Sequence, residues 1–472
     1  MKKFIISMIM ILALTQTSFA EDITIEVNDE LVEFENQPMI VNSRTMVPIK
    51  FIMDTLGYQV AWLSETRQVE ITRGPSKLLL TIDDPLMDID GKSITSDVAP
   101  MIIDDRTYVP LAIIAEATGA EVLWDGDKRR VIINEKLDFL NVFYGSGSYK
   151  AYTALGDSLN QIDQLSYAWS KVEVESGQVT LNKTSMNGNS MFIPEGHELV
   201  MDGRSNRLLN LYADSDYDMI FAQGESLIQT IKSTVISPML GQPEFDGVVI
   251  DFESLPLEYY DQYVDFLTAL REEVPSMTID VAIQPRTYDL NQLLDVVDHI
   301  ILMLHDYESK NDVIVNFNQS HVVQRTASVE DIKKDLDILL SDIPVWDRHK
   351  ILLQVNLAVV QWQGETLYEV KRYTPNYEKL IDRFHSLEFD NFKFDDIAKQ
   401  PFVHYEADGL VNTIWYENEA SLDAKIKIVH DYDLGGLSLW QLGNLTLDLE
   451  DVPEEYQLNI WEKIIENVRS ID

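Results

Sequence analysis

Short, nearly continuous apolar runs recur along the chain from Leu137 onward, and amphipathic or loop-like segments separate them. The runs lie at 139–144, 164–169, 207–212, 247–252, 278–283, 299–304, 350–355 and 435–440. Amphipathic stretches at 259–274, 329–340 and 421–432 lie between several of them. Such runs are typical of parallel strands that are covered on both faces. Eight of them predict an α/β fold, a (β/α)8 TIM barrel with insertions; an open doubly wound sheet is the alternative.

An internal repeat precedes these runs. The segment RTMVPI at 44–49 matches RTYVPL at 106–111, a shift of 62 residues. The same shift aligns four further pairs, which are Gly57 with Gly119, Trp62 with Trp124, Val69 with Val131 and Ile71 with Ile133. Each unit predicts a short strand, an Arg-Thr turn, a helix that begins at Pro and ends at Gly, and two strands of alternating pattern. We expect a small α+β repeat domain at 21–136 and the barrel at 137–472.

The first twenty residues have the pattern of an export signal. Lys2 and Lys3 precede an uncharged apolar run at 4–14, and Ser18-Phe19-Ala20 offers a small-x-small cleavage site. This predicts a signal peptide at 1–20, with an uncleaved anchor as the rival reading. The apolar run is too short for an ordinary membrane span. We therefore expect a secreted or cell-wall-associated protein with no membrane span after cleavage.

The composition and net charge of the chain limit the kinds of ligand it is expected to bind. The 472 residues suggest two or three domains, and the formal net charge is −42. An acidic surface repels phosphate backbones and anionic membranes, so nucleic acid is not an expected partner, and a neutral or cationic ligand suits the chain better. No glycine-rich phosphate-binding motif occurs, which counts against nucleotide binding. The chain has no Cys, which excludes disulfides.

Acidic residues interrupt one of the apolar runs. The stretch FDGVVIDFESLP at 245–256 places carboxylates in an apparent core strand, where charge is costly unless it is paired or used. Strand alternation puts Val249, Asp251 and Glu253 on one face. At the carboxyl end of a barrel strand, Asp251 and Glu253 would point into the mouth. Two such carboxyl groups cannot both ionise freely, so one can stay protonated and act as a general acid. A buried ion pair or a capped strand end is the alternative.

The run DGVVIDFE resembles the signature of glycoside hydrolase family 18, the chitinase-like family, written D-G-x-D-x-D-x-E. Three further segments resemble motifs of this family in the same order: Met303–Asp306 for M-x-Y-D, Trp415–Glu417 with Ser421, Ala424 and Lys425 for W-Y/F-E-D…S…A-K, and Gly435–Gly443 for G-G-x-x-x-W-x-L-G. The resemblance covers Leu137 to the C-terminus and is strongest to the bacterial branch associated with cell walls and spores.

The resemblance implies roles for these residues. Glu253 would be the general acid, and Asp251 would orient the 2-acetamido group of the substrate, which acts as nucleophile in a retaining, substrate-assisted reaction. Asp246 and Gly247 would be structural residues of the motif. The motifs imply substrate contacts from Asp306, His305, Trp440 and Met303, with Trp440 as the aromatic floor of the sugar site. Tyr144 and Gln284 are further expected contacts because they lie near strand ends. The implied substrate is an N-acetylglucosamine-containing glycan, either chitin-like or peptidoglycan, and no metal or cofactor is implied.

Two positions depart from the family pattern. Val249 stands where the family has Asp or Asn, a side chain that supports the charge of the residue two positions later. His305 stands where the family has Tyr, which donates a hydrogen bond to the acetamido carbonyl. A carbohydrate-binding protein without turnover is therefore the second hypothesis, although the retained Glu253 opposes it. A wall or spore assembly protein is a third reading, which rests on the repeat domain alone.

The repeat at 21–136 resembles the copper amine oxidase N-terminal-like domain. A copper site is not expected in it, because there is no Cys and all eight His lie at or after His197. We interpret it as a non-catalytic module, which either docks to the cell wall or a partner or serves as a spacer.

Overall fold

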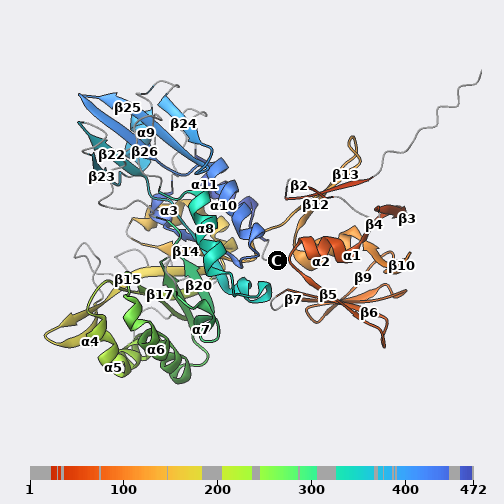
Figure 1. The fold of residues 1–472 in the computed structure, drawn as a ribbon, viewed down its shortest axis with the longest axis horizontal. Helices are drawn as coiled ribbons and strands as arrows, with labels where there is room; N and C mark the ends of the chain where they lie inside the picture. Colours follow the sequence, from red (N-terminus) through yellow and green to blue (C-terminus); the bar gives the residue numbers. More distant parts are fainter. Residues whose placement is uncertain are drawn as a thin grey trace, which may run out of the picture.

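The computed structural model describes two bodies with separate hydrophobic cores, one from 23 to 133 and the other from 137 to 468 (Figure 1). The described residues are 23–28, 30–32, 37–73, 76–145, 147–182, 205–235, 245–284, 288–305, 326–365, 370–375, 377–384, 387, 391–445 and 458–469. The predicted signal peptide, 1–20, lies outside them. Among these residues no helix combines the length and the apolar character that crossing a membrane requires.

Eight parallel strands form a closed barrel in the second body. They are β14 (Leu140–Tyr144), β15 (Gln164–Glu175), β17 (Asn206–Ala213), β18 (Gly247–Phe252), β19 (Thr278–Ile283), β20 (His299–Leu302), β21 (Ile351–Asn356) and β27 (Gly436–Trp440). Each strand pairs with the next, and β14 pairs with both β15 and β27, which closes the ring. All eight predicted runs are strands of this barrel. The TIM barrel is confirmed, and the open doubly wound sheet is wrong.

Helices cover the outside of the barrel. They are α3 (Ser148–Leu155), α4 (Tyr217–Ala222), α5 (Gly224–Val235), α6 (Tyr260–Glu273), α7 (Leu290–Leu294), α8 (Val329–Leu339), α10 (Glu419–Asp431) and α11 (Ile460–Glu466). The three predicted amphipathic stretches form α6, α8 and α10.

Strand alternation divides the hydrophobic core of the barrel body between two layers. On β18, Val248 and Ile250 pack in the large core beneath the helices, whereas Val249 belongs to a smaller cluster inside the barrel with Leu208 and Ile301.

An inserted antiparallel sheet lies between β21 and α10, in the order β23-β22-β26-β25-β24. Its strands are β22 (Val360–Gly364), β23 (Val370–Tyr373), β24 (Phe392–Asp395), β25 (Gln400–Ala407) and β26 (Leu410–Trp415), and the insertion also contains the helix α9 (Tyr377–Phe384). A buried ion pair fastens it to the barrel. Lys425 on α10 lies 2.7 Å from Glu417, just after β26, and both side chains are 1% exposed. Ser421 and Gln400 donate to the same carboxylate, so this motif serves as a structural anchor.

The two repeat units meet at the centre of the N-terminal domain. Strands β4 (Arg44–Pro48) and β11 (Arg106–Pro110) pair antiparallel, with Val47 opposite Val109. Helices α1 (Ile49–Thr55) and α2 (Leu111–Thr118) follow them, and then the hairpins of β5 (Gln59–Leu63) with β6 (Gln68–Arg73) and of β12 (Glu121–Asp125) with β13 (Arg130–Asn134). The remaining strands are β1 (Thr24–Val27), β2 (Glu30–Val32), β3 (Met39–Val41), β7 (Ser76–Thr81), β8 (Leu86–Ile89), β9 (Lys92–Thr95) and β10 (Met101–Ile103).

One detail of the repeat prediction is wrong. The Arg-Thr pairs do not form turns but begin strands β4 and β11. The turns come just before them, at Asn42-Ser43 and Asp104-Asp105, where all four residues have positive φ. Two consecutive residues with positive φ suit a tight hairpin, and Asn and Asp tolerate that conformation better than most residues.

The N-terminal domain contacts the barrel at the end opposite the carboxyl ends of the strands. The repeat-related Gly57 and Gly119, both with positive φ, follow α1 and α2. A Cβ at Gly57 would lie 1.9 Å from an Asp433 oxygen, and one at Gly119 would lie 2.5 Å from the Arg469 guanidinium. Asp433 precedes β27, and Arg469 bonds to the main chain of Leu137, which precedes β14. The two helix ends therefore abut the amino-terminal end of the barrel.

A polar cluster is buried in this junction. Arg73 on β6 lies 3.1 Å from Glu135, and their side chains are 12% and 10% exposed. His430 on α10 approaches the same carboxylate at 3.7 Å. Burial lowers the pKa of His430 to about 4.

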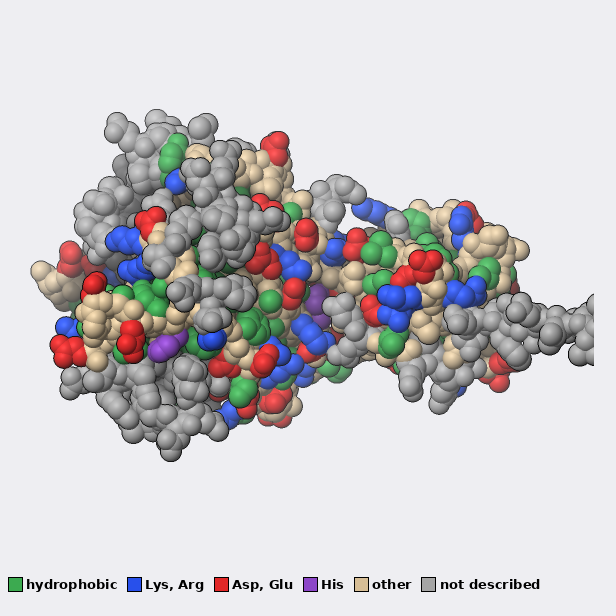
Figure 2. All heavy atoms as spheres, turned by 90° about the horizontal axis from the view of Figure 1, so that it is seen from above, with side chains coloured by type: hydrophobic (Ala, Val, Ile, Leu, Met, Phe, Trp, Pro, Cys, Tyr) green, Lys and Arg blue, Asp and Glu red, His purple; other side chains and the backbone are tan. Residues whose placement is uncertain are grey.

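In the view of Figure 2, acidic and basic side chains both appear on the surfaces of the two bodies.

Candidate active site

The carboxyl end of β18 carries the acidic pair. Asp251 points into the barrel and is 4% exposed. It accepts a hydrogen bond from the Asn210 side-chain amide on β17, with 3.2 Å between Nδ2 and Oδ2. Glu253 follows one residue beyond the strand and is partly buried. Its main-chain N–H donates to the Ala213 carbonyl of β17 at 2.8 Å, and its own carbonyl accepts from the Tyr217 hydroxyl of α4. The backbone of Glu253 is therefore held by β17 and by α4.

The electrostatics of the pair match the expectation for two close carboxyl groups. Burial raises the pKa of Asp251 to about 7, and the negative charge of Glu253 adds to the increase. The hydrogen bond from Asn210 and the nearby His305 act in the opposite direction. Burial and the same Glu253 charge also raise the pKa of Tyr212, the neighbour of Asp251 in the β17–β18 register. Near neutrality the site can therefore hold one proton on a carboxyl group.

Several predicted substrate contacts gather around this pair. His305 follows β20, and its Nε2 lies 2.6 Å from the side-chain oxygen of Gln354 on β21. Met303 lies in the cluster inside the barrel and is 6% exposed. Gln284, after β19, accepts a hydrogen bond from the Ser254 main chain at 3.1 Å, immediately beyond Glu253. Three neighbouring strands thus bring polar side chains to the mouth of the barrel.

Trp440 ends β27 on the interior side. It packs against the cluster inside the barrel, and its ring meets Phe143 edge-on with centroids 5.1 Å apart. The Trp440–Gln441 peptide is cis, and the Trp440 carbonyl accepts from the Leu357 main chain at 2.7 Å. The indole remains partly exposed, as an aromatic floor for a sugar would be.

One predicted substrate contact, Tyr144, does not join the site. Tyr144 is 1% exposed and packs on the outer side of the barrel against Tyr152 of α3, because the alternation of β14 turns Phe143 inward. We therefore do not retain Tyr144 as a sugar contact. Asp306 lies outside the described residues.

The structural residues of the motif lie at the other end of β18. Asp246 accepts from the main chain and the guanidinium of Arg207, at 2.9 and 3.3 Å. Gly247 lies against β19, where a Cβ would come within 2.0 Å of the Thr278 carbonyl oxygen. Asp246 therefore stands apart from the acidic pair, and Gly247 allows two strands to approach closely.

The sequence reading missed Asn210, Tyr212 and Gln354. Each interrupts an apolar run at a position whose side chain faces the interior, next to Asp251 or His305. A polar residue inside a buried strand needs a hydrogen-bond partner, so its position within an apolar run is the feature of the sequence that could have revealed these three residues.

No cluster of metal-ligating side chains occurs among the described residues.

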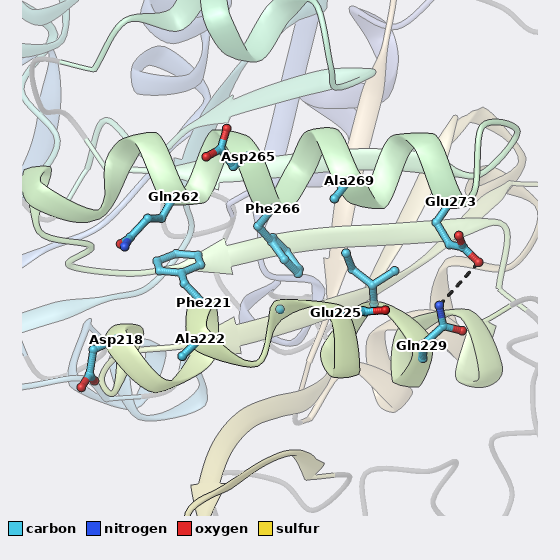
Figure 3. Close-up of a pocket in the computed structure, with 12 residues that line it drawn as sticks. Asp218, Phe221, Ala222, Glu225, Gln229, Gln262, Asp265, Phe266, Ala269 and Glu273 are labelled. Carbon is cyan, nitrogen blue, oxygen red and sulfur yellow. Dashed lines mark hydrogen bonds between the residues drawn. The ribbon is translucent and has the colours of Figure 1, made fainter.

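A groove lies away from the acidic pair, on the outer surface between α4, α5 and α6 (Figure 3). Phe221 and Phe266 point into it, and Asp218, Glu225 and Asp265 lie along its edges. Because it opens on the helical layer, it is separate from the barrel mouth.

Comparison with known proteins agrees with this geometry. Residues 213–444 match the model of glycosyl hydrolases family 18, and residues 26–133 match the copper amine oxidase N-terminal domain. The chain is 22% identical over 233 residues to the cortical fragment-lytic enzyme of Bacillus anthracis, which covers 45% of this chain and 51% of that protein. It is 23% identical over 243 residues to the di-N-acetylchitobiase of Homo sapiens, covering 46% and 63%. The chain spans about half the length of the first of these curated relatives.

The fold also matches a solved structure. The spore cortex-lytic enzyme SleL of Bacillus cereus aligns with a TM-score of 0.53 at 17% identity, over 76% of this chain and 82% of that one. At this identity the likeness concerns the fold alone. Together, the family matches and the closed barrel show that the chain combines a glycosyl hydrolases family 18 domain, matched over 213–444, with a copper amine oxidase N-terminal domain ahead of its barrel.

Proposed function

We propose that this protein is an exported glycosidase that cleaves β-1,4 bonds next to N-acetylglucosamine in chitin-like oligosaccharides or peptidoglycan. The observation that carries the proposal is the pairing of Asp251 and Glu253 at the carboxyl end of β18, where burial and then the charge of Glu253 raise the pKa of Asp251 to about 7, so that a proton is available in the site near neutrality. A general acid must hold its proton at the working pH. Glu253, which is less buried than Asp251 and closer to the mouth, is the acid in this proposal.

The reaction proceeds in two steps on a retaining course. Glu253 donates its proton to the glycosidic oxygen while the acetamido carbonyl oxygen of the substrate attacks the anomeric carbon, and the bond to the leaving sugar breaks. Asp251 accepts a hydrogen bond from the acetamido N–H and balances the positive charge of the oxazolinium ring. Water then attacks the anomeric carbon and gives a proton to the Glu253 carboxylate, while the bond between that carbon and the acetamido oxygen breaks and the acetamido group is restored. Two inversions restore the original configuration.

The choice of substrate rests on the site and on its relatives. Trp440 offers an aromatic face to a sugar ring, and His305 can donate to the acetamido carbonyl. The similar proteins bear names that refer to cortical fragments and to di-N-acetylchitobiose. Of these names, the second refers to an N-acetylated sugar, and we extend to this chain only that substrate class, an N-acetylglucosamine-containing glycan.

The test is direct hydrolysis. The protein is incubated with N-acetylated chitooligosaccharides and, separately, with purified peptidoglycan, and new reducing ends are detected by mass spectrometry. Glu253→Gln should lose cleavage and keep its fold. Asp246→Asn is the matched control, because this acid lies in the same segment but pairs with Arg207 at the far end of the barrel. Binding without cleavage in the parent protein would refute the proposed enzyme.

A carbohydrate-binding protein without turnover is the second candidate. Val249 offers no hydrogen bond to Asp251, and His305 replaces a tyrosine expected from the family pattern. In that case the parent protein and Glu253→Gln would bind chitooligosaccharides with the same affinity, and neither would release a product.

We further propose that the N-terminal domain holds the enzyme at the cell wall. The repeat-related Trp62 and Trp124 are 48% and 49% exposed, and exposed indoles are favourable contacts for sugar rings. The domain adjoins the amino-terminal end of the barrel, so it leaves the mouth open. Cosedimentation with purified cell walls should weaken in Trp62→Ala/Trp124→Ala, whereas hydrolysis of short oligosaccharides should stay unchanged. Equal sedimentation of both proteins would indicate a spacer.

A further inference from the structure

We infer that Asn210 is a positioning residue for Asp251 and that it supplies, from the neighbouring strand, the hydrogen bond that Val249 cannot give. The inference rests on the proposed function, because it concerns the same acidic pair. It adds a residue that none of the recognised motifs contains.

The strand register places Asn210 where it can do this. In the pairing of β17 with β18, Asn210 lies opposite Val249, and Tyr212 lies opposite Asp251. Val249 is fully buried in the apolar cluster inside the barrel. Asp251 therefore has an apolar residue two positions before it on its own strand. Val249 lies between Asn210 on β17 and Asp280 on β19, and the Asp280 carboxylate bonds to Gln164 and His299, whereas Asn210 bonds to Asp251.

The contact itself is specific. The Asn210 amide donates to Asp251 Oδ2 at 3.2 Å, and the two residues are 2% and 4% exposed. Among the described residues, Asp251 Oδ1 and Asn210 Oδ1 are buried without a hydrogen-bond partner. Buried polar atoms are normally paired, so an unpaired acceptor inside a site indicates where a ligand can donate. Asn210 thus occupies one carboxylate oxygen and leaves the other for the acetamido N–H of a substrate.

The other charged or titratable groups around Asp251 cannot replace this bond. Glu253 is negative and disfavours ionisation of Asp251, whereas the charge of His305 favours it from β20. Three tyrosines complete the surroundings, and burial raises the pKa of each: Tyr212, Tyr217 and Tyr263. A hydrogen bond to the ionised form of a carboxyl group favours that form and fixes its orientation. Loss of the Asn210 amide should therefore make Asp251 harder to ionise.

Two variants test the inference. In Asn210→Ala the acid limb of the pH–rate profile should move to higher pH by about one unit, since a hydrogen bond to a charged group is worth roughly that much. The kcat should fall by about tenfold or more at the pH optimum of the parent. Asn210→Ala/Val249→Asn restores an amide from β18, and it should return the acid limb to within a few tenths of a unit of the parent. Asn210→Leu, which is nearly isosteric and has no donor, replaces Asn210→Ala if the smaller residue prevents folding.

A readout independent of turnover separates this inference from the proposed function. The protein is labelled with carbon-13 at the Asp carboxyl carbons, and Asp251→Asn identifies the resonance of Asp251 in an NMR titration. A titration that moves to higher pH in Asn210→Ala supports the inference, even if the parent protein cleaves nothing. An unchanged titration and an unchanged acid limb in Asn210→Ala and Asn210→Leu would overturn it, even if the parent is an active enzyme.

Discussion

Asp251 shares the interior face of β18 with Val249, so its buried carboxyl group rests on an apolar layer of the barrel. Burial is accordingly the main cause that raises its pKa to about 7, ahead of the repulsion from Glu253. Such a group is useful to catalysis but costly to stability once it ionises.

The first prediction concerns stability and pH. An unfolded Asp titrates near 4, whereas the folded Asp251 titrates near 7, so only the folded protein holds this proton between these values. The contribution of Asp251 to the free energy of unfolding should therefore fall as the pH rises from about 4 to about 7. Asp251→Asn removes this dependence. It should match the parent at pH 4 and exceed it by about 2–4 kcal/mol at pH 8.

Urea unfolding of both proteins at the two pH values provides the measurement. A difference between parent and variant that is the same at pH 4 and at pH 8 would contradict the raised pKa of Asp251.

The second prediction concerns the buried junction between the domains. Arg73→Met leaves Glu135 buried without its ion-pair partner, which should cost about 3 kcal/mol. The double variant Arg73→Met/Glu135→Leu should recover much of this loss, because an apolar pair can replace a buried ion pair. Chemical unfolding measures both. Arg67→Met is the control, since its pair with Asp83 is 59% and 66% exposed and should contribute less than about 1 kcal/mol. Equal losses in Arg73→Met and Arg67→Met would show that the junction does not depend on this pair.

The third prediction concerns Gly247. A Cβ at this position would overlap the Thr278 carbonyl, which belongs to the rigid backbone of β19. Gly247→Ala should therefore lower the free energy of unfolding by about 1–3 kcal/mol, as overpacking does elsewhere. Gly126→Ala is the matched control, because a Cβ there meets its nearest atom at 3.5 Å. If both variants unfold at the same denaturant concentration, the close approach of β18 and β19 is not the reason for glycine.

The barrel strands could be predicted from the local sequence pattern, because each of them is a compact apolar run that can be recognised without knowing its partner strand. It was not sufficient for the inserted sheet from β22 to β26, whose strands alternate irregularly and are fixed by antiparallel pairing with one another. Strand parity placed Asp251 and Val249 together correctly. It did not exclude Tyr144 as a sugar contact, because both faces of β14 are buried and the sequence alone does not show which face is interior.

The support for Asp251 could not be predicted from its own strand. Asn210 is 41 residues away in sequence, and the hydrogen bond depends on the register of β17 against β18. Likewise, the turn before each Arg-Thr pair became visible only with the backbone conformation, since Asn-Ser and Asp-Asp are compatible with several turn types.

The most direct test of the central claim is the release of new reducing ends from N-acetylated chitooligosaccharides or peptidoglycan by the parent protein and by Glu253→Gln, followed by mass spectrometry. We predict cleavage by the parent and a loss of about 10²–10⁴-fold in the variant, the usual contribution of a general acid. Asp246→Asn should cleave like the parent. No cleavage by the parent, or equal cleavage by the parent and Glu253→Gln, would contradict the role assigned to the Asp251–Glu253 pair.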